Sequence, residues 1–97
     1  MQTFETNPEY FEKKAEILKA LSHPVRLCIV KSLLEVGESN VMNMQNCLKV
    51  PQSTISQYLA VLKSAGIIKG RREGSEVYYS VQNDYVKDIV KTLFTGE

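Results

Sequence analysis

The chain has 97 residues, of which 43% are apolar, and its formal net charge is +1. This composition excludes a disordered chain, and the length predicts a single domain over residues 1–97. The first residues lack the basic and apolar segments of a secretory signal, and no apolar run is long enough to cross a membrane. We therefore expect a cytoplasmic protein without a membrane partner.

The charges are unevenly distributed along the chain. Residues 39–72 contain no Asp or Glu, and the basic residues among them are Lys49, Lys63, Lys69, Arg71 and Arg72. All the acidic residues lie outside that range. A basic surface on a nearly neutral protein is typical of a chain that contacts phosphate groups. Residues 39–72 are therefore the candidate for such a contact.

Two helices are predicted at the start of the chain. In residues 8–20, apolar residues recur at positions i, i+4 and i+7 between charged ones, which indicates an amphipathic helix. Ser22 is a candidate cap, and Pro24 suits the first turn of the next helix. This second helix, about 24–35, is apolar on nearly all sides, so we expect it at the centre of the core.

Residues 40–66 predict two more helices with a tight turn between them. Ser39 or Asn40 can cap a short helix, which Pro51 interrupts. The helix after Pro51 is predicted to end at Gly66, a residue suited to the left-handed conformation that follows many helices. Its inward face is predicted to consist of Ile55, Leu59 and Leu62.

Beyond residue 66 the apolar period changes from helical to twofold. Residues 67–81 therefore predict a β-hairpin, with its turn at residues 73–75 and basic residues on its first strand. Residues 83–95 return to helical spacing after Asn83, a candidate cap. The predicted fold is mainly α with a β-hairpin (α+β), in the order α-α-α-α-β-β-α.

This order is that of a winged helix-turn-helix, in which the hairpin is the wing. The major groove of B-DNA admits one helix, and the amino-terminal turns of that helix read the base edges. Here the helix carries uncharged polar side chains and one lysine placed for a phosphate: Gln52, Ser53, Thr54, Ser56, Gln57, Tyr58 and Lys63. The wing is predicted to contact the DNA backbone or the minor groove through Lys69, Arg71, Arg72, Gly74 and Ser75.

Three stretches resemble the ArsR/SmtB family of winged-helix repressors: LKALSHPVRL at residues 18–27, PQSTISQYLAVLKSAGII at 51–68, and RREGSEVYYS at 71–80. The resemblance covers nearly the whole chain. It implies a homodimer, joined through the first and last helices, that represses transcription from double-stranded operator DNA of two-fold symmetry. The apolar residues of those helices that we expect at the dimer interface are Phe11, Ala15, Leu18, Val86, Ile89, Val90 and Leu93.

Many members of this family sense metal ions, but the corresponding ligands are missing from this sequence. Asn40 and Met42 stand where the resemblance places two cysteines, and neither offers the thiolate that a thiophilic ion needs. The last helix contains no histidine, and His23, the only one in the chain, lies in a Ser-His-Pro turn. We therefore expect no metal site and no cofactor.

Thiol sensing is another mode in this family, and it stays open as an alternative. Cys28 and Cys47 are predicted at core positions, where thiols are inert, but a redox-responsive repressor that uses both would also fit. A repressor without a ligand, or with an unidentified small-molecule or protein effector, fits equally well. A winged-helix module that binds only proteins is the rival from another class. An enzyme is not expected, because no nucleophile motif or phosphate loop is present.

Overall fold

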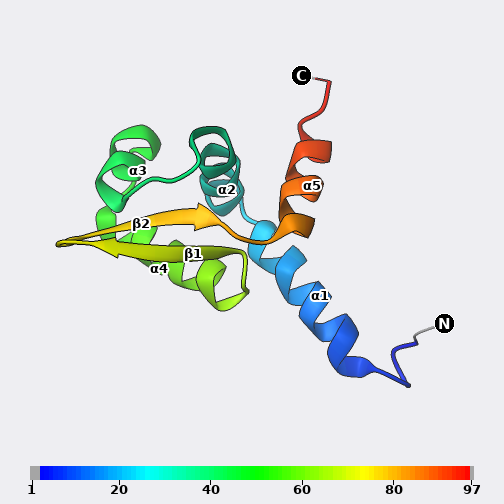
Figure 1. Cartoon of the computed structure of the whole chain (residues 1–97). Coiled ribbons are helices and arrows are strands. Elements are labelled where there is room, and N and C mark those ends of the chain that lie inside the picture. Colours follow the sequence, from blue (N-terminus) through cyan, green and yellow to red (C-terminus); the bar gives the residue numbers. More distant parts are fainter. Residues whose placement is uncertain (1–2, 97) are drawn as a thin grey trace.

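The structure is a computed structural model that describes residues 3–96. Its helices are α1 (Pro8–Leu21), α2 (Pro24–Val36), α3 (Val41–Leu48), α4 (Gln52–Ser64) and α5 (Asp84–Leu93), and its strands are β1 (Ile68–Glu73) and β2 (Glu76–Val81). The predicted order of elements is confirmed. Figure 1 shows α3, α4 and the hairpin gathered on one side of α2, with α1 and α5 at the other end of the molecule.

The core forms around α2, as its apolar composition predicts. The inward face of α4 packs on it, and Ile67, Ile68 and Val81 close the core from the hairpin side. Complete burial of such a side chain stabilises a fold by roughly 1.5–3 kcal/mol. The buried apolar residues are Ala20, Leu21, Ile29, Val30, Leu33, Met44, Ile55, Leu59, Leu62, Ile67, Ile68, Val81, Val86 and Val90.

The cap of α2 differs from the prediction. Ser22 ends α1, and the N-cap of α2 is His23, because Pro24 already occupies the first helical position. The His23 Nδ1 atom accepts a hydrogen bond from the backbone N–H of Val25 at 3.2 Å. Since Nδ1 is the acceptor, the ring proton lies on Nε2, which is 3.3 Å from the Tyr58 hydroxyl. One imidazole therefore caps α2 and contacts α4.

The hairpin is antiparallel, and its register pairs Ile68 with Val81 and Glu73 with Glu76. Its turn contains Gly74, which has a positive φ of 62°. The hairpin is also attached on its other edge. Ser39, in the segment between α2 and α3, exchanges two backbone hydrogen bonds with Tyr79, of 2.8 and 3.1 Å. The root of the wing is thereby joined to the start of the helix-turn-helix.

The two end helices differ from the prediction in which residues they expose. Val86 and Val90 are buried in the core of their own chain, with Val86 0% exposed, so they are not available to a partner. In contrast, Leu18 and Leu93 are each 58% exposed. The apolar stripe of α5 was therefore wrongly assigned as a whole to a partner surface. No helix among residues 3–96 is both long enough and apolar enough to cross a membrane.

Candidate nucleic-acid interface

The amino terminus of α4 is open. The N-cap position is Pro51, and no side chain caps the helix, whereas the other four described helices each have a side-chain cap. The first N–H groups of a helix point outward and carry partial positive charge, which favours an anionic partner such as a DNA phosphate. The sequence alone did not distinguish this helix start from the others by that property.

The first turns of α4 present uncharged hydrogen-bonding groups to solvent. Gln52, Ser53, Ser56 and Gln57 are exposed, and Thr54 is half-buried. Ile55 and Leu59 point into the core and hold the helix in place. Gln amides can pair with the two hydrogen-bonding atoms of an adenine edge, and Ser hydroxyls can bond to bases or phosphates. Lys63, also exposed, lies in the last turn of the helix.

Tyr58 is the exception among the predicted base-reading residues. It is half-buried, its ring centroid lies 4.7 Å from that of His23, and the Arg26 guanidinium carbon lies 5.7 Å from its ring. Tyr58 therefore packs α4 against the start of α2, and its role as a DNA contact stays a prediction. One-dimensional spacing did not reveal this role because His23 is 35 positions away.

The wing has two kinds of basic residue. Lys69 and Arg72 are exposed, and within residues 3–96 no ion pair is formed by either. Arg71, in contrast, forms ion pairs with Glu38 at 2.6 Å and Glu73 at 2.7 Å. At the tip, Gly74 and Ser75 are exposed.

The electrostatics of the wing centre on Arg71. The hydrogen bond from Arg71 lowers the pKa of Glu38 below its ordinary value. The hydrogen bonds to Glu38 and Glu73 raise the pKa of Arg71 further above its ordinary value. The guanidinium carbon also lies 5.2 Å from the ring of Tyr78. Glu38 was missed as a functional residue, although it and Glu73 are the acidic residues that directly flank the acid-free stretch 39–72.

The family's metal position offers no thiolate in this chain. The side-chain oxygen of Asn40 accepts a hydrogen bond from the Asn43 N–H at 2.9 Å, so Asn40 serves as the cap of α3. Met42 is exposed and offers only a thioether. Among residues 3–96 there is no group of three His, Cys, Asp or Glu side chains placed to hold a metal ion.

The two cysteines do not lie in the core, which corrects the prediction. Both Cys28 and Cys47 are exposed free thiols. The buried side of α2 is formed by Ile29, Val30 and Leu33, and this leaves Cys28 on the solvent side. Because α2 is apolar on nearly all sides, its sequence did not indicate which side faces solvent. Cys47 borders a cleft of about 220 Å³ between α2 and α3.

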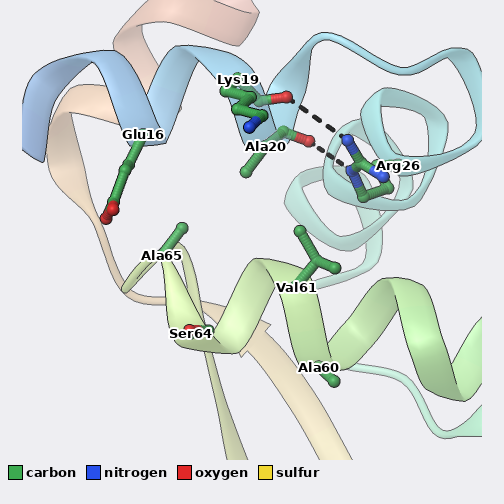
Figure 2. A pocket seen from close by; sticks show the side chains of 8 residues that line it. All are labelled: Glu16, Lys19, Ala20, Arg26, Ala60, Val61, Ser64 and Ala65. Atoms are coloured by element: carbon green, nitrogen blue, oxygen red, sulfur yellow. Dashed lines mark hydrogen bonds between the residues drawn. The ribbon is translucent and has the colours of Figure 1, made fainter. Parts of the chain in front are cut away.

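A larger cleft, of about 600 Å³, lies between α1, α2 and the second half of α4 (Figure 2). Arg26 reaches across it from α2: its Nε donates to the carbonyl of Ala20 at 2.7 Å, and its Nη2 to that of Lys19 at 3.4 Å. The bond to Ala20 satisfies a carbonyl that the end of α1 leaves open, whereas the Lys19 carbonyl also accepts from the Ser22 N–H. The only acidic side chain in the lining is Glu16, and no nucleophile is paired with a base there.

Comparisons with known proteins agree with this geometry. The family model described as bacterial regulatory protein, arsR family, matches residues 23–69, which run from the α2 cap to the first wing strand. An uncharacterized HTH-type transcriptional regulator of Methanocaldococcus jannaschii is 48% identical over 85 residues, which are 88% of this chain and 96% of that protein.

Two further relatives have crystal structures, and one of them is named as a transcriptional repressor. The transcriptional repressor PagR of Bacillus anthracis is 43% identical over 82 residues, which are 84% of this chain and 82% of PagR. Its crystal structure superposes with a TM-score of 0.80, covering 87% of this chain and 95% of that one. The crystal structure of NolR from Sinorhizobium fredii, 33% identical, gives a TM-score of 0.83 and covers 96% of this chain and 93% of that one.

Proposed function

This chain belongs to the ArsR family of bacterial regulatory proteins, and from that premise we propose that it is a homodimeric repressor that binds an operator of two-fold symmetry. The family is one of transcriptional regulators and not of enzymes. The observation that carries the proposal is the open, uncharged start of α4 beside a wing with exposed Lys69 and Arg72. In this proposal the protein acts in the cytoplasm, where its operator is.

In the proposed complex, α4 lies in the major groove. Gln52, Ser53, Ser56 and Gln57 face the base edges, and the open helix terminus faces a phosphate. Because none of these groups is charged, they contribute sequence preference more than general affinity. The general affinity then comes from Lys63 and the wing, through release of counterions from the DNA.

The dimer is proposed to form through α1 and α5. Phe11, Ala15, Leu18 and Leu93 are exposed, and Ile89 is half-buried. A groove of about 300 Å³ between the two helices is lined by Ile17, Leu18 and Ile89 among others. Exposed apolar side chains gathered at one end of so small a chain favour association, since pairing removes them from water. A two-fold dimer would place two copies of α4 on successive turns of one DNA face.

The dimer surface is tested by Leu18→Glu, with Val36→Glu as its control. Leu18 is 58% exposed on α1, and Val36 is 66% exposed at the end of α2, where it borders the cleft with α3. Sedimentation velocity at several protein concentrations should show a dimer for the wild type and for Val36→Glu, and a folded monomer for Leu18→Glu. A dimer that Leu18→Glu leaves intact would place the interface elsewhere.

DNA binding is tested with a duplex from the region upstream of the protein's own gene and a random duplex of equal length. Fluorescence anisotropy over a range of salt concentrations should give affinity that falls steeply with salt, with a log–log slope of about −0.9 per phosphate contact. The operator should be preferred over random DNA. Affinity independent of salt would favour the module that binds only proteins.

A thiol-responsive repressor is the second candidate, and the exposure of both Cys28 and Cys47 favours it. Exposed thiols are accessible to oxidants, in contrast to buried ones. If the candidate is correct, mild oxidation should release the operator, and the double variant Cys28→Ser, Cys47→Ser should bind equally well in oxidant and reductant. Oxidant-independent binding by the wild type would exclude this mode.

A further inference from the structure

Three consecutive residues connect the wing to the helix-turn-helix. They belong to the linker between α2 and α3, residues 37–40. Glu38 forms an ion pair with Arg71 of β1, Ser39 pairs through its backbone with Tyr79 of β2, and Asn40 caps α3. The wing is therefore held by contacts at its root from the same segment that begins the helix-turn-helix.

Each of the three guanidinium nitrogens of Arg71 donates one hydrogen bond to a carboxylate, although the side chain is 51% exposed. Its Nη2 donates to Glu38 Oε1 at 2.6 Å, its Nε to Glu38 Oε2 at 3.4 Å, and its Nη1 to Glu73 Oε2 at 2.7 Å. The contact with Glu38 uses two nitrogens and both carboxylate oxygens, an arrangement that fixes orientation as well as distance. The guanidinium also lies over the ring of Tyr78.

The charge around Arg71 is unfavourable for a phosphate. Two carboxylates, Glu38 and Glu73, surround one guanidinium, so the group of three carries a net negative charge. A phosphate that approached Arg71 would meet both carboxylates at short range. Arg72 is different, because it pairs with no carboxylate within residues 3–96. Lys69 forms no ion pair there either, although its positive charge helps to lower the pKa of Glu38.

We propose that Arg71 is a positioning residue rather than a phosphate contact, and that Glu38 is its partner in fixing the wing relative to α4. The wing's phosphate contacts then come from Lys69 and Arg72. This inference rests on the proposed DNA binding, and it changes the prediction from sequence, which gave Arg71 and Arg72 the same role. An exposed ion pair holds two flexible side chains weakly by itself, but here the adjacent Ser39 and Tyr79 backbones already bring the pair together.

The salt dependence of operator binding separates the two roles. Each lost phosphate contact makes the log–log slope less steep by about 0.9. Arg72→Gln, the matched control, should show that change. Arg71→Gln should keep the wild-type slope and lose roughly fivefold in affinity, the effect of one exposed ion pair. A slope that Arg71→Gln reduces as much as Arg72→Gln would overturn the proposal.

The second test substitutes Glu38, the other partner of the ion pair. If it positions Arg71, then Glu38→Gln should also lose roughly fivefold in affinity at an unchanged slope. The exchanged pair Glu38→Arg, Arg71→Glu should recover most of that loss, because the ion pair forms again with reversed polarity. If Glu38 only screens Arg71 from DNA, Glu38→Gln should bind more tightly with a steeper slope, and the exchanged pair should bind worst. Either of those results would overturn the proposal.

A measurement without DNA distinguishes failure of this inference from failure of the proposed function. The Tyr79 amide donates to the Ser39 carbonyl at 2.8 Å, so its hydrogen exchange reports on the root of the wing. Exchange should be about fivefold faster in Arg71→Gln than in the wild type, and unchanged in Arg72→Gln. Equal exchange in all three proteins would overturn the inference. Absence of operator binding by the wild type would instead overturn the proposed function.

Discussion

The recognition helix α4 and the wing lie on the same side of the molecule but are held by different forces. Apolar burial of Ile55, Leu59 and Leu62 fixes α4, and its polar face has no capping side chain at its start. The wing is a two-stranded hairpin of which only the first pair, Ile68 and Val81, is buried in the core; beyond that pair it is held by one backbone bridge and one ion-pair cluster. Core substitutions should therefore displace α4, whereas changes in charge, salt or pH should act first on the wing.

The largest effect should come from removing a buried apolar side chain of α4. Ile55 is fully buried, so Ile55→Ala should lower the free energy of unfolding by roughly 2–5 kcal/mol. Its exposed neighbour provides the control, since Ser56→Ala should change that free energy by less than about 0.5 kcal/mol. Urea unfolding at one protein concentration measures both. Similar values for the two variants would mean that burial does not hold α4.

The base-reading role of α4 should appear in specificity. Gln57→Ala should reduce the difference in binding free energy between operator and random DNA by roughly 1–3 kcal/mol, because it removes an amide that pairs with a base edge. Arg72→Ala on the wing should lower the affinity for both duplexes equally, since phosphates are the same in every sequence. Competition binding on the two duplexes measures the ratio. Equal losses for Gln57→Ala on both duplexes would contradict base reading at this position.

The helical and twofold periods of the apolar residues were enough to predict every element of the fold, because burial imposes those periods on the sequence. The short helix α3 and the hairpin turn at Gly74 were predicted by their caps and turn residues as well. The cap of α2 was misplaced by one residue, since a histidine is an unusual capping side chain and Ser22 was the more common choice.

The site was predicted less completely because its distinctions depend on long-range contacts. Arg71 and Arg72 are adjacent and chemically identical, but they occupy opposite faces of β1, and only Arg71 reaches Glu38, 33 positions earlier. Tyr58 likewise makes a contact that its sequence neighbours do not indicate, because its hydroxyl reaches His23, 35 positions earlier. For Cys28, the composition of α2 suggested burial on all sides, but a helix in a protein of this size has one face left to solvent.

A smaller effect is expected at the tip of the wing, where backbone conformation matters more than charge. Gly74 has a φ of +62°, which costs a β-branched residue about 1–2 kcal/mol. Gly74→Val should therefore weaken binding to operator and random DNA by roughly tenfold. Gly74→Asn is the control, because asparagine tolerates this conformation and should bind nearly as the wild type does. Equal binding by all three proteins would show that the tip does not contact DNA.

The smallest effect should be the response of the wing root to acid. The Arg71 hydrogen bond lowers the pKa of Glu38 below 4.5, so the carboxylate favours the folded wing at higher pH, and this contribution is lost as pH falls through that lowered value.

The observable is the Tyr79 amide exchange rate of Glu38→Gln divided by that of the wild type at each pH, a ratio that cancels the intrinsic pH dependence of exchange. The ratio should exceed one near neutral pH and approach one as the pH falls through the lowered pKa of Glu38. Because Glu73 also faces Arg71, the Glu73→Gln background should retain this change if Glu38 is the partner that fixes the wing. A ratio that stays constant through the acidic range would mean that the ionised form of Glu38 does not hold the wing.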